Sequence, residues 1–254
     1  MNLKITFLGT GTSQGVPVIS CNCHVCSSKN FKDNRLRTSI WIETDQLSII
    51  IDSGPDFRFQ VLRAGIPKLD AILFTHQHRD HLAGLDDVRG FNFKQKMAMP
   101  IYGNKLVIEQ IKREFHYVFE NKYPGIPQLE IHQIDNIPFQ IEDLNITPIQ
   151  VLHHKLPVFG FRIEDFTYIT DANTIPREEI DKIKGTKTLV INALQKDDHL
   201  SHFTLEEALK VIEDIHPEKA FLTHMSHNMG LHDEVSKELP SNIFLAYDGL
   251  SITV

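Results

Sequence analysis

An apolar strand that runs directly into a cluster of histidines is the feature that most constrains this chain. Residues 71–75 (AILFT) have the composition of a buried strand, and residues 76–81 (HQHRDH) follow with three imidazoles and a metal-binding carboxylate. Because such a polar group is costly to desolvate within a sheet, we expect it in a loop at the rim, where side chains two residues apart converge. Histidine and aspartate at this spacing are typical metal ligands. The expected ligands are His76 and His78 for one ion, and Asp80 and His81 for another.

Three other predicted strands also end in residues that bind metals. One loop supplies too few ligands for two ions, so more histidines and a bridging carboxylate must come from elsewhere. The strands at residues 145–152, 168–170 and 220–223 lead into His153 with His154, into Asp171, and into His224 with His227. Rigid strands that end at one edge of a sheet can present a preorganised site. We therefore expect these side chains to complete one two-metal site.

Residues 75–84 (THQHRDHLAG) resemble the signature of the metallo-β-lactamase superfamily, and the resemblance covers essentially the whole chain. It implies an α/β fold, namely a four-layer αβ/βα sandwich with a dinuclear metal site. It also implies a role for each ligand: the first ion is held by His76, His78 and His153, the second by Asp80, His81 and His224, and Asp171 bridges them. Asp52, at the end of a predicted strand, matches the aspartate that supports the metal loop from behind.

Two adjacent histidines compete for one position in this set. Neighbouring side chains leave a strand in opposite directions, so only one of His153 and His154 can easily face the ions. The segment resembles the family form in which the first histidine is the ligand, and we therefore predict His153. His154 is expected near the substrate or in solvent.

All three cysteines of the chain fall within residues 20–28 (SCNCHVCSS). Three cysteines cannot all pair as disulfides, and thiols this close suit a structural zinc, which takes four sulfur or nitrogen ligands. The fourth ligand is either His24, which is sterically awkward between flanking ligands, or a distant histidine. If His224 serves the dinuclear site, His227 is free to close the cysteine site.

Further motifs resemble the phosphoribosyl 1,2-cyclic phosphate phosphodiesterases of the carbon–phosphorus lyase pathway. These are GTGTSQGVPV at residues 9–18, C-x-C-x-x-C at residues 21–26, and LTHMSH at residues 222–227. The resemblance implies a structural zinc bound by Cys21, Cys23, Cys26 and His227. It also implies hydrolysis of a small phosphodiester, expected to be a cyclic ribose phosphate, by attack of a metal-bound hydroxide.

Two residues are predicted to act in catalysis. A ribose oxygen that leaves phosphorus needs a proton, and His202 occupies the place of the family's leaving-group histidine, with His199 as the second choice. Asp80 is expected to be catalytic as well as a metal ligand. The catalytic ions are expected to be zinc or manganese, since imidazole and carboxylate ligands accept both.

Composition sets the wider expectations. The chain has 254 residues, 41% of them hydrophobic, and a formal charge of −7. Strands and helices alternate throughout, with the clearest helix at residues 204–215, so we predict a single metallo-β-lactamase-like domain over residues 1–254. We find no apolar stretch of membrane-spanning length and no signal peptide, and we expect a cytoplasmic protein. Its expected partner is a small phosphodiester; membranes are excluded, nucleic acid is disfavoured by the charge, and a homodimer is left open.

Two alternatives share the main motifs. The nucleases that process transfer-RNA 3′ ends have the same histidine loop, but this chain shows no basic, glycine-rich arm for gripping RNA. The pyrroloquinoline quinone biosynthesis protein of the superfamily has a similar cysteine loop and acts in cofactor maturation, whereas the complete ligand set here favours hydrolysis. No substrate-binding residue is predicted: Arg35, Arg37, Arg58 and Lys155 lie in predicted loops, where charged side chains are usually exposed.

Overall fold

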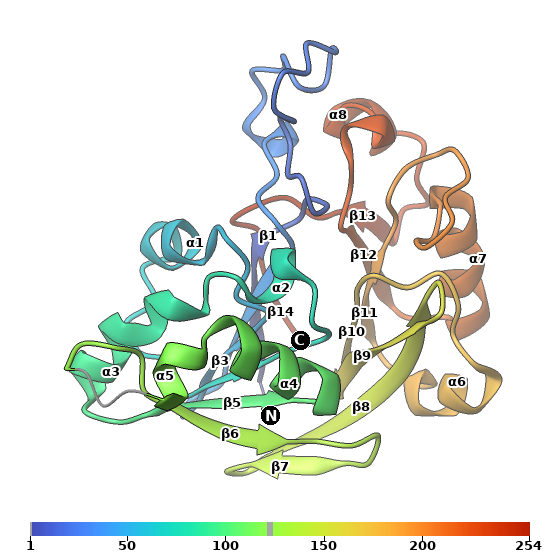
Figure 1. Ribbon diagram of the computed structural model, residues 1–254. Helices are drawn as coiled ribbons and strands as arrows, with labels where there is room; N and C mark the ends of the chain where they lie inside the picture. The colour runs from blue at the N-terminus through green and yellow to red at the C-terminus, as the bar shows by residue number, and fades with distance from the viewer. Residues whose placement is uncertain (1, 121–123) are drawn as a thin grey trace.

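Two seven-stranded sheets pack face to face in the computed structural model, which describes residues 2–120 and 124–254 (Figure 1). In spatial order, the first sheet contains β14 (Ser251–Thr253), β1 (Lys4–Gly9), β2 (Ser39–Glu43), β3 (Ser48–Ile51), β4 (Ala71–Leu73), β5 (Met99–Gly103) and β6 (Leu129–Gln133). The second contains β13 (Ile243–Leu245), β12 (Lys219–Thr223), β11 (Thr188–Asn192), β10 (Phe166–Ile169), β9 (Leu156–Ile163), β8 (Leu144–His153) and β7 (Phe139–Ile141). Strands β3 to β6 and β10 to β13 pair in parallel.

Helices cover the outer face of each sheet, which gives four layers (Figure 1). The first sheet is covered by α1 (Phe57–Ala64), α2 (Arg79–Leu82), α3 (Arg89–Gln95), α4 (Lys105–Glu114) and α5 (His116–Glu120). The second is covered by α6 (Arg177–Ile183), α7 (Leu205–Ile215) and α8 (His232–Val235). A central core that includes Phe7, Ile42 and Phe161 fills the space between the sheets. The predicted fold class, an αβ/βα sandwich, is therefore confirmed.

Local sequence explains the best-defined elements. Central strands such as β3 (SIII) and β4 (AIL) are buried along their whole length, because a sheet lies on one side and helices on the other. Helix α7 begins where predicted: Thr204 accepts from the Glu207 backbone, and the Glu207 side chain accepts from the Thr204 backbone. Within the described ranges, no helix has both the length and the apolar character needed to cross a bilayer.

Two predicted helices are shorter than expected. The pattern at residues 105–119 predicts one helix, but the backbone leaves helical geometry at Phe115, so α4 and α5 are separate. The pattern at residues 231–239 also predicts one helix, but only α8 within this range is helical. In both places apolar residues at helical spacing are buried without a continuous helix, because tertiary packing overrides local propensity.

Two close backbone contacts hold the histidine loop against the end of β3. The Ser53 amide donates to the His81 carbonyl at 2.8 Å, and the Gly84 amide donates to the Ser53 carbonyl at 2.8 Å. A Cβ on Gly84 would lie 2.1 Å from the Gly54 carbonyl oxygen and 2.6 Å from Phe57 Cβ. No side chain fits there without a backbone shift.

We predict that Gly84→Ala lowers the free energy of unfolding by about 1–3 kcal/mol, the usual cost of overpacking. The matched control is Gly90→Ala in α3, where an added Cβ meets nothing within 4 Å. That change should leave stability unchanged or raise it by up to about 1 kcal/mol, the helix-propensity difference. Chemical denaturation measures both, and equal effects of the two substitutions would show that the Gly54–Gly84 contact is not tight in solution.

Candidate metal centres

Three residues at the predicted site end strands in a left-handed backbone conformation. Asp52 follows β3 with φ 64°, Asp171 follows β10 with φ 56°, and His224 follows β12 with φ 58°. Such conformations are uncommon for residues other than glycine and concentrate at functional sites. Each strand therefore turns sharply at the residue that carries the polar group.

The four residues expected around the second ion come together. The ligand atoms of Asp80, His81, Asp171 and His224 all lie within 4.8 Å of one another. His81 Nε2 is 3.2 Å from both Asp80 Oδ2 and Asp171 Oδ2, and His224 Nε2 is 3.1 Å from Asp171 Oδ1. One carboxylate, Asp171, thus contacts histidines from both sheets.

The residues expected around the first ion are adjacent to this group. The ring centroids of His76 and His78 are 4.5 Å apart, and those of His78 and His153 are 5.2 Å apart. His153 also lies within ligand distance of Asp171. His154 instead adopts φ 56°, is exposed, and donates its amide to the Asn173 side chain. The fold brings His153, and not His154, to the cluster.

His202 lies deeper in the cluster than a solvent-facing loop histidine would. It is 7% exposed, its ring stacks on His224 at 4.8 Å, and its Nδ1 is 3.9 Å from Asp171 Oδ1. Burial and the neighbouring His224 lower the pKa of His202 to about 3. His202 also lies within ligand distance of His153 and Asp171, so it can serve either as a ligand or as a proton carrier. His199 is exposed and accepts from the Ser201 amide.

The unpartnered nitrogens of the cluster fit divalent metal ions. Four buried rings have nitrogen atoms that make no hydrogen bond of acceptable geometry with a described residue, although His81 Nε2 and His224 Nε2 lie 3.1–3.2 Å from carboxylate oxygens. These nitrogen atoms are His76 Nε2, His81 Nε2, His202 Nδ1, and both nitrogens of His224. Unpartnered buried polar atoms are costly, and a metal ion would satisfy them. Burial would raise the pKa of Asp171, but His224 and His81 hold it well below its usual range. An ionised carboxylate among imidazoles is the donor set that zinc or manganese takes.

Asp52 fixes the orientation of His81 without joining the ligand group. Its Oδ2 is 2.7 Å from His81 Nδ1 and accepts from Thr75 Oγ1 at 2.8 Å, while its Oδ1 accepts from the Thr75 amide at 2.9 Å. The other nitrogen of His81 is thereby left to face Asp80 and Asp171. Thr75 and the Ser201 carbonyl, which lies 2.9 Å from His153 Nδ1, were not predicted. Thr75 could have been noticed as the polar residue that separates the apolar strand from the histidines.

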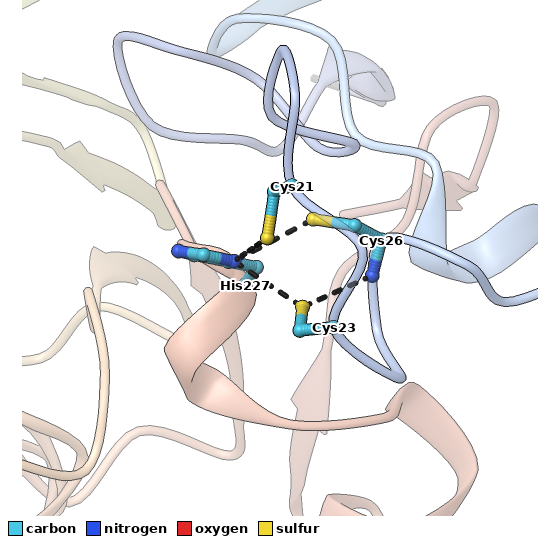
Figure 2. A group of neighbouring side chains, drawn as sticks. All are labelled: Cys21, Cys23, Cys26 and His227. Atoms are coloured by element: carbon cyan, nitrogen blue, oxygen red, sulfur yellow. Dashed lines mark hydrogen bonds between the residues drawn. The ribbon is translucent and has the colours of Figure 1, made fainter.

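The three cysteines surround one histidine nitrogen. His227 Nδ1 lies 3.3 Å from Cys21 Sγ, 3.3 Å from Cys23 Sγ and 3.5 Å from Cys26 Sγ (Figure 2). One ring nitrogen cannot make three hydrogen bonds at once. Metal–sulfur and metal–nitrogen distances of about 2.3 Å and 2.0–2.1 Å place these atoms about 3.5 Å apart in a tetrahedron, so the four residues fit a zinc ion. His24 is exposed and lies outside this group.

Backbone amides support two of the thiols. The Cys26 amide donates to Cys23 Sγ at 3.4 Å, and this contact is the main reason that the pKa of Cys23 falls to about 6. The Val18 amide donates to Cys26 Sγ at 3.3 Å, but burial raises the pKa of Cys26 to about 11. Thiolate ligands must be deprotonated, so metal binding here would release protons.

Arg35 is buried behind the cysteine loop, which corrects the expectation that it is exposed. It is 1% exposed and donates to the Ser226 carbonyl at 2.9 Å and the Gly230 carbonyl at 3.0 Å, on either side of His227. It also lies 3.5 Å from Asp33 Oδ1. Asp33 in turn accepts from Ser28 in the cysteine loop. The Asp33–Arg35 pair therefore links the cysteine loop to the segment that carries His227. This structural role of Arg35 could not be inferred from its position in the sequence.

Comparisons with known proteins identify a matching family model and a similar solved structure. A family model described as a beta-lactamase superfamily domain matches residues 48–225, which include every predicted ligand of the dinuclear site but none of the cysteine site. A solved structure described as a new diphosphatase from the PhnP family is 36% identical, with a TM-score of 0.94 over 100% of this chain and 98% of that one.

Two other relatives are informative. Zinc-bound PqqB from Methylobacterium extorquens is 18% identical, with a TM-score of 0.79 over 98% of this chain and 99% of that one, so it shares the fold. An octanoyltransferase of Porphyromonas gingivalis is 41% identical over 99% of this chain. The chain spans only 52% of that protein, about half of its length.

We predict that Arg35→Met weakens metal retention at the cysteine site and lowers the free energy of unfolding by about 3–5 kcal/mol, because Asp33 is left buried without its partner. Chelator competition followed by metal analysis measures retention, and chemical denaturation measures stability. His227→Ala removes a predicted ligand, so it gives the metal retention and the free energy of unfolding expected when the cysteine site is lost completely.

The double variant Asp33→Asn/Arg35→Met separates positioning from simple destabilisation. It removes both buried charges, so it should recover part of the stability, but the Ser226 and Gly230 carbonyls still lack their donor and metal retention should stay low. Wild-type retention in the double variant would show that Arg35 does not position His227.

Proposed function

The chain belongs to the metallo-β-lactamase superfamily of metal-dependent hydrolases, and from this premise we propose that it hydrolyses a small phosphodiester, with a cyclic ribose phosphate as the first candidate. The observation that carries the proposal is the assembled cluster in which Asp171 contacts His81 and His224 beside unpartnered buried nitrogens. When bound, two divalent ions would supply Lewis-acid activation of water and of a phosphoryl oxygen.

The chain's own residues would position the reaction and move its protons. Asp52 holds His81, and Ser201 holds His153, so the ligand rings are fixed before substrate arrives. His202 is neutral at physiological pH, since its pKa is about 3. Its buried Nδ1, which makes no hydrogen bond with a described residue and lies 3.9 Å from Asp171 Oδ1, is the geometric basis for assigning it the role of carrying a proton from the attacking water to the leaving oxygen. Asp80, from the same loop as His81, would be a ligand beside the reacting groups.

A second candidate substrate is a diphosphate. The 36% identical structure is described as a diphosphatase. Phosphodiesters and diphosphates both contain an anionic phosphoryl group from which an oxygen leaves during hydrolysis. Octanoyl transfer is not proposed, because the chain matches about half of the protein with that name. A transfer-RNA nuclease is disfavoured by the formal charge of −7, and a role in cofactor maturation by the complete ligand set.

Two further properties belong to the proposal. We assign zinc to the cysteine site, and zinc or manganese to the dinuclear site. We also place the protein in the cytoplasm, where thiols stay reduced, because Cys21, Cys23 and Cys26 gather around His227 as a site for reduced thiolate ligands.

We expect the purified protein, reconstituted separately with zinc and with manganese, to hydrolyse phosphoribosyl 1,2-cyclic phosphate. Bis(p-nitrophenyl) phosphate tests general diesterase activity, and a dinucleoside diphosphate tests the second candidate. Asp171→Asn is the matched control, because it should abolish activity that arises from this site. Cleavage of the diphosphate alone would replace the first candidate by the second, and inactivity on all three substrates would contradict the proposed function.

We predict that His202→Ala lowers kcat by about 10²–10⁴-fold while metal content stays unchanged, as expected for loss of a proton carrier. Loss of metal from the variant would make His202 a ligand instead. A near-wild-type rate would remove it from the mechanism. His199→Ala is the control, because His199 is exposed and lies outside the ligand groups.

A further inference from the structure

An apolar groove of about 420 Å³ lies between α1 and α3, on the outer side of the first sheet. None of the predicted metal ligands lines it. Its floor includes the buried side chains of Phe57 and Phe91, and its rim carries Leu62 and Phe93, which are 63% and 68% exposed. Large apolar side chains grouped at a concave surface are typical of interaction sites.

A glycine lines the same groove. Gly90 lies in the first turn of α3, where glycine costs up to about 1 kcal/mol relative to alanine. An added Cβ would meet nothing within 4 Å, so no contact among the described residues requires glycine here. The missing side chain leaves open space at this exposed position and allows a partner backbone to approach closely.

The charge at the rim is opposite to that of the whole chain. Three cations, Arg58, Arg89 and Lys94, line the groove, and Asp87 is its only carboxylate in the part of the chain that the structure describes. Arg89 is paired with Asp86, but neither Arg58 nor Lys94 has a carboxylate partner among the described residues. The chain as a whole carries −7. The groove is therefore a local cationic and apolar surface on an acidic protein.

We propose that this groove binds an amphipathic helix of a partner protein whose apolar face is flanked by Asp and Glu. Helices commonly dock by laying an apolar face into such a groove, while opposite charges at the rim set the orientation. A concave surface whose lining includes an uncrowded glycine fits a helix better than it fits a flat bilayer. The inference is independent of the proposed hydrolysis.

The test uses a synthetic helical peptide of about 18 residues, with Leu at helical spacing and Glu beside the apolar face, and a matched peptide with Lys in place of Glu. Fluorescence anisotropy should give a dissociation constant at least about tenfold lower for the Glu peptide, and this preference should shrink as salt is added. Equal binding of the two peptides, or no binding of the Glu peptide, would overturn the proposal.

Three variants locate the binding. Gly90→Trp should fill the groove and abolish binding, and Arg58→Glu/Lys94→Glu should reverse the preference toward the Lys peptide. The control Ile137→Glu changes a 66% exposed apolar residue elsewhere and should bind like wild type. Denaturation curves confirm that each variant is folded. Unchanged binding by folded Gly90→Trp would place the peptide elsewhere and refute the proposal.

Two other occupants are separate outcomes. Co-sedimentation of the wild type with phosphatidylglycerol vesicles, lost in Gly90→Trp, would make the surface a membrane contact. A dimer in sedimentation velocity that Gly90→Trp converts to a monomer would make a second copy the occupant. Either result would overturn the assignment to an acidic partner helix.

Discussion

The contact between the Asp52 carboxylate and the His81 ring is the interaction on which the proposed dinuclear centre depends. It joins the end of β3 to the loop that follows β4, two neighbouring parallel strands, and both groups are buried. Burial raises the pKa of Asp52, and the contacts with His81 and Thr75 reduce that rise without cancelling it. One short contact thus fixes the ring that must meet Asp171 from the opposite sheet, and it couples the packing of the first sheet to the geometry of the site.

The chain closes the site from two directions. The histidine loop comes from the first sheet, and His153, Asp171 and His224 come from strand ends of the second. Two residues beyond His224, the Ser226 carbonyl accepts from Arg35, and His227 meets the three cysteines (Figure 2). A metal ion at the cysteine site would therefore restrain the segment that carries His224, a proposed ligand of the other site, since binding free energy at a structural site is folding free energy.

The sequence predicts this architecture well where one local rule decides the outcome. Apolar strands that end in polar residues predict where the proposed ligands come together, and the helical pattern from residue 204 places the start of α7. Local rules fail where the deciding contact is distant in sequence. Arg35 is predicted to be an exposed cation in a loop, but the carbonyls to which it donates lie 191 and 195 residues away, and only the folded chain shows that it is buried. The division between α4 and α5 and the left-handed turns at Asp52, Asp171 and His224 likewise depend on tertiary packing.

Phe57 lies between the apolar groove and the histidine loop. It forms part of the groove floor, and its Cβ lies 2.6 Å from the place that a Cβ on Gly84 would occupy. Gly84 in turn donates to Ser53 beside Asp52. Protein interiors are close-packed and transmit small displacements, so a partner seated on Phe57 cannot move it without pressing on the loop that carries Asp80 and His81. The histidine loop and the groove therefore share a packing contact at Phe57, which lies beside Gly84. A change that loosens the packing at Gly84 is expected to alter the geometry of both the loop and the groove.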